Sequence, residues 1–196
     1  MTDPVPASHE ALVAHLISRD VLKTARVIAA FEAVDRKDFV LAAYAGDAYA
    51  DEPLPIGLGQ TISQPLTVAF MLELLAPREG EKILDVGSGS GWTTAMLAHI
   101  VGEKGSVIGV ERILELVEFG RKNLAKYTLP QAQIMPSGDA IGLPEQAPPA
   151  LLPPEGYDRI LVSAAAQELP QELVKQLRVV GRLVLPIGNS VWKIDR

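Results

Sequence analysis

The chain has 196 residues, of which 48% are hydrophobic and 21% charged, so it suits one globular domain and is too apolar for a disordered chain. Its formal net charge of −6 disfavours a nucleic-acid-binding surface. The sequence contains no cysteine, which excludes disulfides, thiolate metal sites and cysteine nucleophiles.

Targeting and metal-binding signals are also missing from the sequence. The N-terminal segment MTDPVPASHE lacks the basic start and apolar core of a signal peptide, and the longest apolar run is too short to span a bilayer. The three histidines lie far apart, without the spacing of metal ligands. We therefore expect a cytoplasmic protein without a metal, which contacts neither membranes nor nucleic acid.

Residues 1–64 are expected to form a helical extension followed by an ordered, irregular segment. Apolar residues recur at helical spacing between Ser8 and Val34, with Ser8 and Thr24 as candidate N-caps. Residues 48–65, AYADEPLPIGLGQTISQP, are rich in proline and glycine and lack helical periodicity. Long irregular segments inside compact chains are commonly functional, and the apolar residues of this one indicate that it is ordered.

Strands and helices alternate from residue 65 onward. Helices are expected at residues 65–76, 91–101, 114–127 and 171–177, and strands at 82–86, 106–110, 132–135, 159–162 and 182–186. Such alternation predicts an α/β fold with a mostly parallel sheet and helices on both faces. Prolines in residues 142–157 exclude a regular helix there, so a surface excursion replaces one crossover helix. We expect one domain over residues 1–196, with its α/β core at 65–196.

The turn after the first of these strands is the candidate ligand site. It reads DVGSGSG, with Asp85 at the strand end, followed by Gly87, Ser88, Gly89 and Gly91. In open α/β sheets, ligands bind beyond the carboxyl ends of the strands, where the strand order reverses. A bare turn would need only one glycine, whereas several glycines allow a ligand to approach the backbone closely.

The acids near this turn favour S-adenosylmethionine over a dinucleotide. The dinucleotide fingerprint Gly-x-Gly-x-x-Gly has its acid about twenty residues later, but here Asp85 precedes the glycines. A pyrophosphate is disfavoured beside a carboxylate, whereas Asp85 suits the ammonium group of S-adenosylmethionine. Glu111, followed by Arg112, is placed to accept both ribose hydroxyls, and Asp139, followed by Ala140, to accept the adenine amino group. These acids predict a Rossmann-like, class I S-adenosylmethionine-dependent methyltransferase fold.

Several segments together resemble one family of methyltransferases. DRKDFV at residues 35–40, YADEPLPIGLGQTISQP at 49–65, the glycine motif and GRLVLPIG at 181–188 follow the order and spacing of the protein-L-isoaspartate (D-aspartate) O-methyltransferase family. The PLPIGxGQTISQP stretch is specific to that family. The resemblance implies a repair enzyme that methylates the α-carboxylate of L-isoaspartyl residues in damaged proteins and releases S-adenosylhomocysteine.

The resemblance also implies which residues meet the acceptor. Ser63 corresponds to the family's active-site serine. Because a carboxylate is already ionised at neutral pH, no general base is required, so Ser63 is expected to position the acceptor and not to act as a nucleophile. The substrate-side residues that the resemblance implies are Thr61, Ile62, Ala164 and Ala165.

Two departures from the family pattern leave the acceptor open. Ala166 stands where the family commonly has proline, and the sequence stops at NSVWKIDR, where the family continues with two strands that complete the acceptor pocket. Residues 191–194 could begin a sixth strand, which would leave a sheet edge exposed. The alternatives are a methyltransferase of the same fold acting on a small molecule or RNA, and a non-catalytic cofactor-binding relative. A monomer is the expected oligomeric state.

Overall fold

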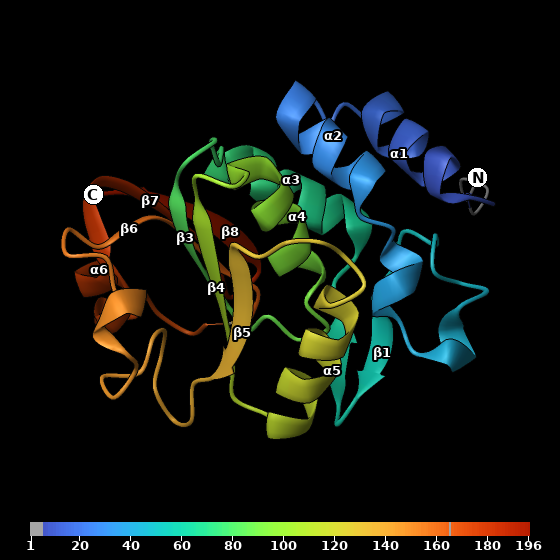
Figure 1. Ribbon diagram of the computed structural model, residues 1–196. Helices are drawn as coiled ribbons and strands as arrows, with labels where there is room; N and C mark the ends of the chain where they lie inside the picture. The colour runs from blue at the N-terminus through green and yellow to red at the C-terminus, as the bar shows by residue number, and fades with distance from the viewer. Residues whose placement is uncertain (1–5, 165) are drawn as a thin grey trace.

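The structure, a computed structural model, describes residues 6–164 and 166–196. Within these residues a six-stranded sheet runs through the centre of the molecule in the order β5-β4-β3-β6-β7-β8 (Figure 1). Its strands are β3 (Lys82–Val86), β4 (Ser106–Glu111), β5 (Ala132–Pro136), β6 (Tyr157–Val162), β7 (Leu177–Ile187) and β8 (Ser190–Asp195). The helices are α1 (His9–Ser18), α2 (Ala25–Ala33), α3 (Pro65–Leu75), α4 (Trp92–Val101), α5 (Leu114–Leu124) and α6 (Gln171–Gln176).

The predicted mostly parallel sheet is confirmed. β3 pairs in parallel with β4 on one side and with β6 on the other, and only the β7–β8 pair among these strands is antiparallel. The strand order therefore reverses beside β3, which places the glycine turn at the carboxyl end of that strand. β8 is the expected sixth strand, and it forms the edge of the sheet.

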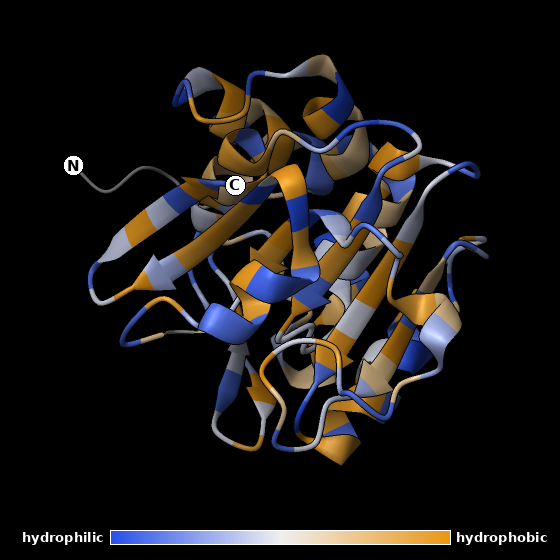
Figure 2. Cartoon of the chain, turned by 90° about the vertical axis from the view of Figure 1, so that its left-hand side faces the viewer, coloured by the Kyte–Doolittle hydropathy of each residue, from blue (hydrophilic) through white to orange (hydrophobic). Residues whose placement is uncertain are grey.

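Both faces of the sheet are covered, but unevenly. Side chains alternate along each strand, so Ile83 packs into one hydrophobic cluster with α1 to α5, and Leu84 packs into a second cluster on the opposite face. The second face is covered by α6 and by the proline-rich excursion, which contains the short 3-10 helix η3 (Pro149–Leu151). Figure 2 shows the central strands as largely hydrophobic, as burial on both faces requires.

The N-terminal helical region consists of two helices with different starts. The Ser8 hydroxyl accepts a hydrogen bond from the Ala11 amide at 3.2 Å, so the predicted N-cap of α1 is confirmed. Thr24 occupies the predicted N-cap position of α2, but its side chain makes no capping bond to that helix. Its hydroxyl donates to the Glu73 carboxylate instead, which ties the start of α2 to α3.

The segment expected to be irregular contains regular structure. Residues 48–65 include a hairpin of β1 (Leu54–Gly57) and β2 (Gln60–Ile62). Two 3-10 helices, η1 (Arg36–Phe39) and η2 (Ala42–Tyr44), lie before that segment. The hairpin loop, Leu58–Gly59, has φ angles of +53° and +72°, which is the left-handed conformation of a tight two-residue turn. The proline and glycine content concealed this hairpin, because such residues are usually depleted in strands.

Other boundaries differ less from expectation. β7 begins at Leu177 and not at residue 182, while α5 ends at Leu124 and not at 127. Among the described residues, no helix combines the length and the apolar composition needed to cross a bilayer.

Candidate functional site

A cavity of about 840 Å³ lies at the carboxyl ends of β3, β4 and β6. The β1–β2 hairpin and the start of α3 form one wall, and the glycine turn and the end of β4 form the floor. Residues 162–164 and 166–173 form the opposite wall. Ile56 of the hairpin reaches the glycine turn, since its Cδ1 atom lies 3.3 Å from the position that a Cβ on Gly89 would take. A volume of this size is typical of small-molecule sites.

The backbone amides of the glycine turn are occupied by the chain itself. The amides of Gly87 and Ser88 donate to the carbonyl of Val110 at 2.8 and 3.1 Å, and the Gly89 amide donates to Glu111 Oε2 at 3.1 Å. Gly87 and Gly89 adopt φ angles of +78° and +50°, at which a residue with a side chain would be strained. The turn therefore offers little of the free amide array that a pyrophosphate requires.

Glu111 connects the turn to the end of β4 and lines the cavity. Its Oε1 accepts the amides of Arg112 and Ile113 at 2.8 and 3.0 Å, while Oε2 accepts the Gly89 amide. A carboxylate has about four acceptor positions, so roughly one remains for a ligand hydroxyl. Accepting both ribose hydroxyls, as predicted, would require one of these amides to be released.

Asp85 lies outside the cavity lining, and its contact with a ligand ammonium stays a prediction. Its side chain is 0% exposed, and its Oδ2 accepts the hydroxyls of Thr93 and Thr94, both at 2.7 Å. Burial raises the pKa of this carboxyl to about 6, although the two hydroxyls lower it. Asp85 therefore supports the start of α4 from beneath the turn. The two threonines that cover the carboxylate lie in the first turn of α4, and the strand pattern did not reveal this contact.

Gly91 and Asp139 also lie away from the cavity lining. Gly91 has a φ of +89°, and a Cβ there would lie 3.0 Å from the carbonyl oxygen of Gly120, so this glycine serves the contact between α4 and α5. Asp139 is exposed and outside the lining, whereas Ser137 and Ala140 on either side of it line the cavity. The cofactor contacts of these two residues therefore stay predictions.

The structure brings most of the other predicted residues together. The lining contains Thr61, Ile62, Ser63, Gly87, Ser88, Gly89, Glu111, Arg112, Ala140 and Ala164. Ala165, the remaining predicted substrate residue, lies outside the described residues. Residues predicted from five separate parts of the sequence thus face one space.

Sequence reasoning missed several lining residues. Trp92 follows the last glycine directly, and Ile56 and Gln60 belong to the PLPIGLGQTISQP stretch, so each adjoined a recognised motif. Glu168 and Glu172 line the opposite wall. They had no sequence signal, because their position depends on how α6 packs against β7.

Comparison with known proteins is consistent with this geometry. Residues 7–195 match the family model described as protein-L-isoaspartate(D-aspartate) O-methyltransferase (PCMT). The chain is 42% identical over 194 residues to the protein-L-isoaspartate O-methyltransferase of Methanopyrus kandleri, with 96% of this chain and 82% of the relative covered. It is 46% identical over 193 residues to the protein of that name from Aeropyrum pernix, with 98% and 71% covered.

A solved structure extends the similarity to three dimensions. A crystal structure of a protein-L-isoaspartate O-methyltransferase from Plasmodium falciparum, described as a complex with S-adenosyl-L-homocysteine, matches with a TM-score of 0.80 and 28% identity. The match covers 96% of this chain and 89% of the other. The similarity therefore includes the N-terminal helices as well as the α/β core.

Proposed function

The chain belongs to the protein-L-isoaspartate(D-aspartate) O-methyltransferase family, and we propose that it methylates the α-carboxylate of L-isoaspartyl residues in damaged proteins. The observation that carries the proposal is the shared cavity. The family's TIS segment, Thr61 to Ser63, and the glycine turn face the same space of about 840 Å³. A cofactor and an acceptor side chain can therefore meet there.

The residues present fit S-adenosylmethionine. The occupied amides of the glycine turn disfavour a phosphate, and the remaining acceptor position of Glu111 suits a ribose hydroxyl. Ile113, Leu116 and Ile141 add apolar lining beside Glu111, which suits an adenine ring. S-adenosylmethionine supplies a methyl group on a positively charged sulfur, and transfer of that group to a carboxylate oxygen yields a methyl ester and S-adenosylhomocysteine.

The chemistry of the lining favours a carboxylate as the acceptor. Among the described residues, the charged side chains that line the cavity are Glu111, Arg112, Glu168 and Glu172, and no histidine, lysine or tyrosine lines it. An ionised carboxylate needs no base to become a nucleophile, unlike an alcohol or an ammonium group. The protein then needs mainly to align the reactants, which can lower a barrier by about 7–11 kcal/mol.

Ser63 is the residue that we propose positions the acceptor. It is half-buried and lines the cavity directly before α3. The N-cap position of α3 is Gln64, so the Ser63 hydroxyl is not occupied in capping that helix. It can donate one hydrogen bond to the acceptor carboxylate and hold it in place.

The decisive experiment is transfer of labelled methyl from S-adenosylmethionine to two matched peptides, one isoaspartyl and one aspartyl. We expect a base-labile methyl ester on the isoaspartyl peptide only. If neither peptide is methylated while S-adenosylhomocysteine still binds by calorimetry, the chain has another acceptor or is a non-catalytic binding protein.

The variant Ser63→Ala tests the positioning role in the same assay. Loss of a hydrogen bond to a charged group costs about 1.5–3 kcal/mol, so kcat/KM should fall roughly tenfold to a hundredfold. The dissociation constant for S-adenosylhomocysteine should not change. Ser106→Ala, which alters a serine at the start of β4 outside the cavity lining, is the matched control. Unchanged kcat/KM in Ser63→Ala would remove Ser63 from the reaction.

A further inference from the structure

Arg36 is a fully buried cation that does not line the cavity. Its side chain is 0% exposed, and its guanidinium donates hydrogen bonds to four backbone carbonyls. Nη1 donates to Ala48 at 2.8 Å and Ala50 at 3.0 Å, and Nη2 donates to Glu52 at 2.8 Å and Ser63 at 3.2 Å. One side chain thus gathers both ends of the segment that leads to the TIS wall.

The charge of Arg36 makes this arrangement costly. Burial lowers the pKa of the guanidinium to about 10, while the carboxylates of Asp51 and Glu52 act in the opposite direction, so the group stays cationic at neutral pH. The bonds that hold it run to carbonyls, which carry no full charge. A buried charge without close ionic compensation destabilises a fold unless hydrogen bonds satisfy it, so its presence needs a reason.

The same guanidinium also contacts the residue that directly follows the glycine turn. Its central carbon lies 5.5 Å from the ring centroid of Trp92, in a cation–π arrangement. Trp92 lines the cavity and is the first residue of α4, directly after the glycine turn. Arg36 therefore links the backbone of Ser63 to the element that carries the glycine turn.

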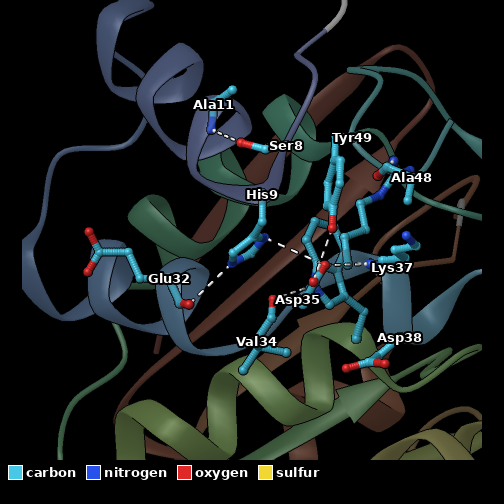
Figure 3. A network of polar contacts seen from close by, with 12 residues as sticks. Ser8, His9, Ala11, Glu32, Val34, Asp35, Lys37, Asp38, Ala48 and Tyr49 are labelled. Atoms are coloured by element: carbon cyan, nitrogen blue, oxygen red, sulfur yellow. Dashed lines mark hydrogen bonds and ion pairs between the residues drawn. The ribbon is translucent and has the colours of Figure 1, made fainter. Parts of the chain in front are cut away.

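The backbone around Arg36 is itself held in place. Figure 3 shows the Asp35 carboxylate between His9 and Tyr49. It accepts the Lys37 amide at 2.9 Å and the Tyr49 hydroxyl at 3.1 Å, and His9 Nδ1 lies 3.7 Å away. Arg36 thus projects from a backbone fixed at the neighbouring residue, which limits the movement of its guanidinium.

We propose that Arg36 is a positioning residue for methyl transfer, whose guanidinium holds residues 48–63 against Trp92 and so sets the distance between Ser63 and the glycine turn. The inference rests on the proposed function. The planar, forked guanidinium reaches four carbonyls at once, whereas a lysine ammonium has three donors on a single nitrogen. Arg36→Lys should therefore keep the charge and lose the alignment.

The test compares Arg36→Lys with Arg159→Lys, in full-length protein and at a temperature where both are folded. Arg159 is also buried and ion-paired, but its partner Glu81 lies at the opposite end of the sheet. We expect kcat on the isoaspartyl peptide to fall about tenfold to a hundredfold in Arg36→Lys only, since small misplacements at a reacting centre have effects of that size. The dissociation constant for S-adenosylhomocysteine should change less than about twofold.

A second readout does not depend on turnover. In Arg36→Lys, amide hydrogen exchange should accelerate in residues 48–63 and stay unchanged in the strands, whereas Arg159→Lys should leave residues 48–63 unaffected. If the wild-type protein methylates neither peptide, the proposed function fails, and this measurement still decides whether Arg36 holds the segment.

Chemical rescue completes the test. Millimolar guanidinium, far below denaturing concentrations, should restore kcat in Arg36→Ala, and methylammonium should not. Wild-type kcat and exchange in Arg36→Lys would overturn the proposal. So would equal losses in Arg36→Lys and Arg159→Lys, or failure of Arg36→Lys to fold when Arg159→Lys folds, because each would mark a purely structural role.

Discussion

Asp85 is a carboxylate that the fold removes completely from water. It is the fourth residue of β3, and two threonine hydroxyls of α4 satisfy one of its oxygens. The other oxygen, Oδ1, has no hydrogen-bond partner among the described residues. Desolvation therefore raises its pKa to about 6, and the nearby charge of Glu111 contributes to the rise. Holding this ionised group near neutral pH destabilises the fold.

The variant Asp85→Asn should expose that cost as a pH dependence of stability. The folded-state pKa lies above the ordinary value of about 3.9, so the wild-type residue contributes stability below about pH 4 that is lost as the pH rises through about 6. In thermal unfolding of ligand-free protein, the free energy of unfolding of Asp85→Asn should rise relative to that of the wild type by up to about 3 kcal/mol across that pH range. Exposed Asp139→Asn is the control. If the stability difference between Asp85→Asn and the wild type does not vary with pH, ionisation of Asp85 does not destabilise the fold.

At the scale of elements, the contact between α4 and α5 depends on glycines from both. Gly91 is the N-cap residue of α4 and Gly120 lies within α5. A Cβ on Gly120 would come within 2.8 Å of the Gly89 carbonyl oxygen. The helices therefore approach closely enough that α5 packs directly against the glycine turn. Sequence reasoning assigned Gly91 to the ligand because a glycine required by a helix contact and one required by a ligand look alike.

Gly120→Ala should therefore disturb both the fold and the cofactor site. Overpacking at such a contact costs about 1–3 kcal/mol, and the displaced carbonyl belongs to the turn that lines the cavity. We expect a lower midpoint of urea unfolding and weaker binding of S-adenosylhomocysteine by calorimetry. Gly46→Ala is the matched control, since a Cβ there meets no atom within 4 Å. Equal stability of the two variants would mean that α5 moves aside without cost.

At the scale of the whole molecule, one hydrophobic cluster joins the N-terminal helices to the sheet. Leu12 of α1 and Phe31 of α2 belong to the same cluster as Ile83 and Val107 of the central strands. The ring of Phe31 also meets Trp92 edge to face, with centroids 5.6 Å apart. This packing supports the prediction of a single domain over residues 1–196, which remains to be tested.

Unfolding in urea should accordingly be a single cooperative transition. In Trp192→Phe, which alters a half-exposed residue of the edge strand β8, Trp92 is the remaining tryptophan and reports on the contact with α2. Its fluorescence and the far-UV circular dichroism should change together. A fluorescence transition that precedes the loss of sheet signal would show that the N-terminal helices form a separate unit.

The sequence by itself determined the features that depend on local pattern. Periodicity located the helices and strands of the core, and the glycine turn with the PLPIGLGQTISQP stretch located most of the cavity lining. These features are readable because side-chain alternation, turn chemistry and motif spacing act over a few residues. The hairpin at residues 54–62 was not predicted, because its prolines and glycines are unfavourable in strands.

The tertiary structure alone decided which of the motif residues face the cavity. Threonines of α4 cover Asp85, and Gly91 packs against α5. Asp139 lies outside the cavity lining. Arg36 gained its position from carbonyls that lie up to 27 residues away in the sequence. Burial and hydrogen bonding of this kind arise from the packing of distant segments, so no spacing within one segment encodes them.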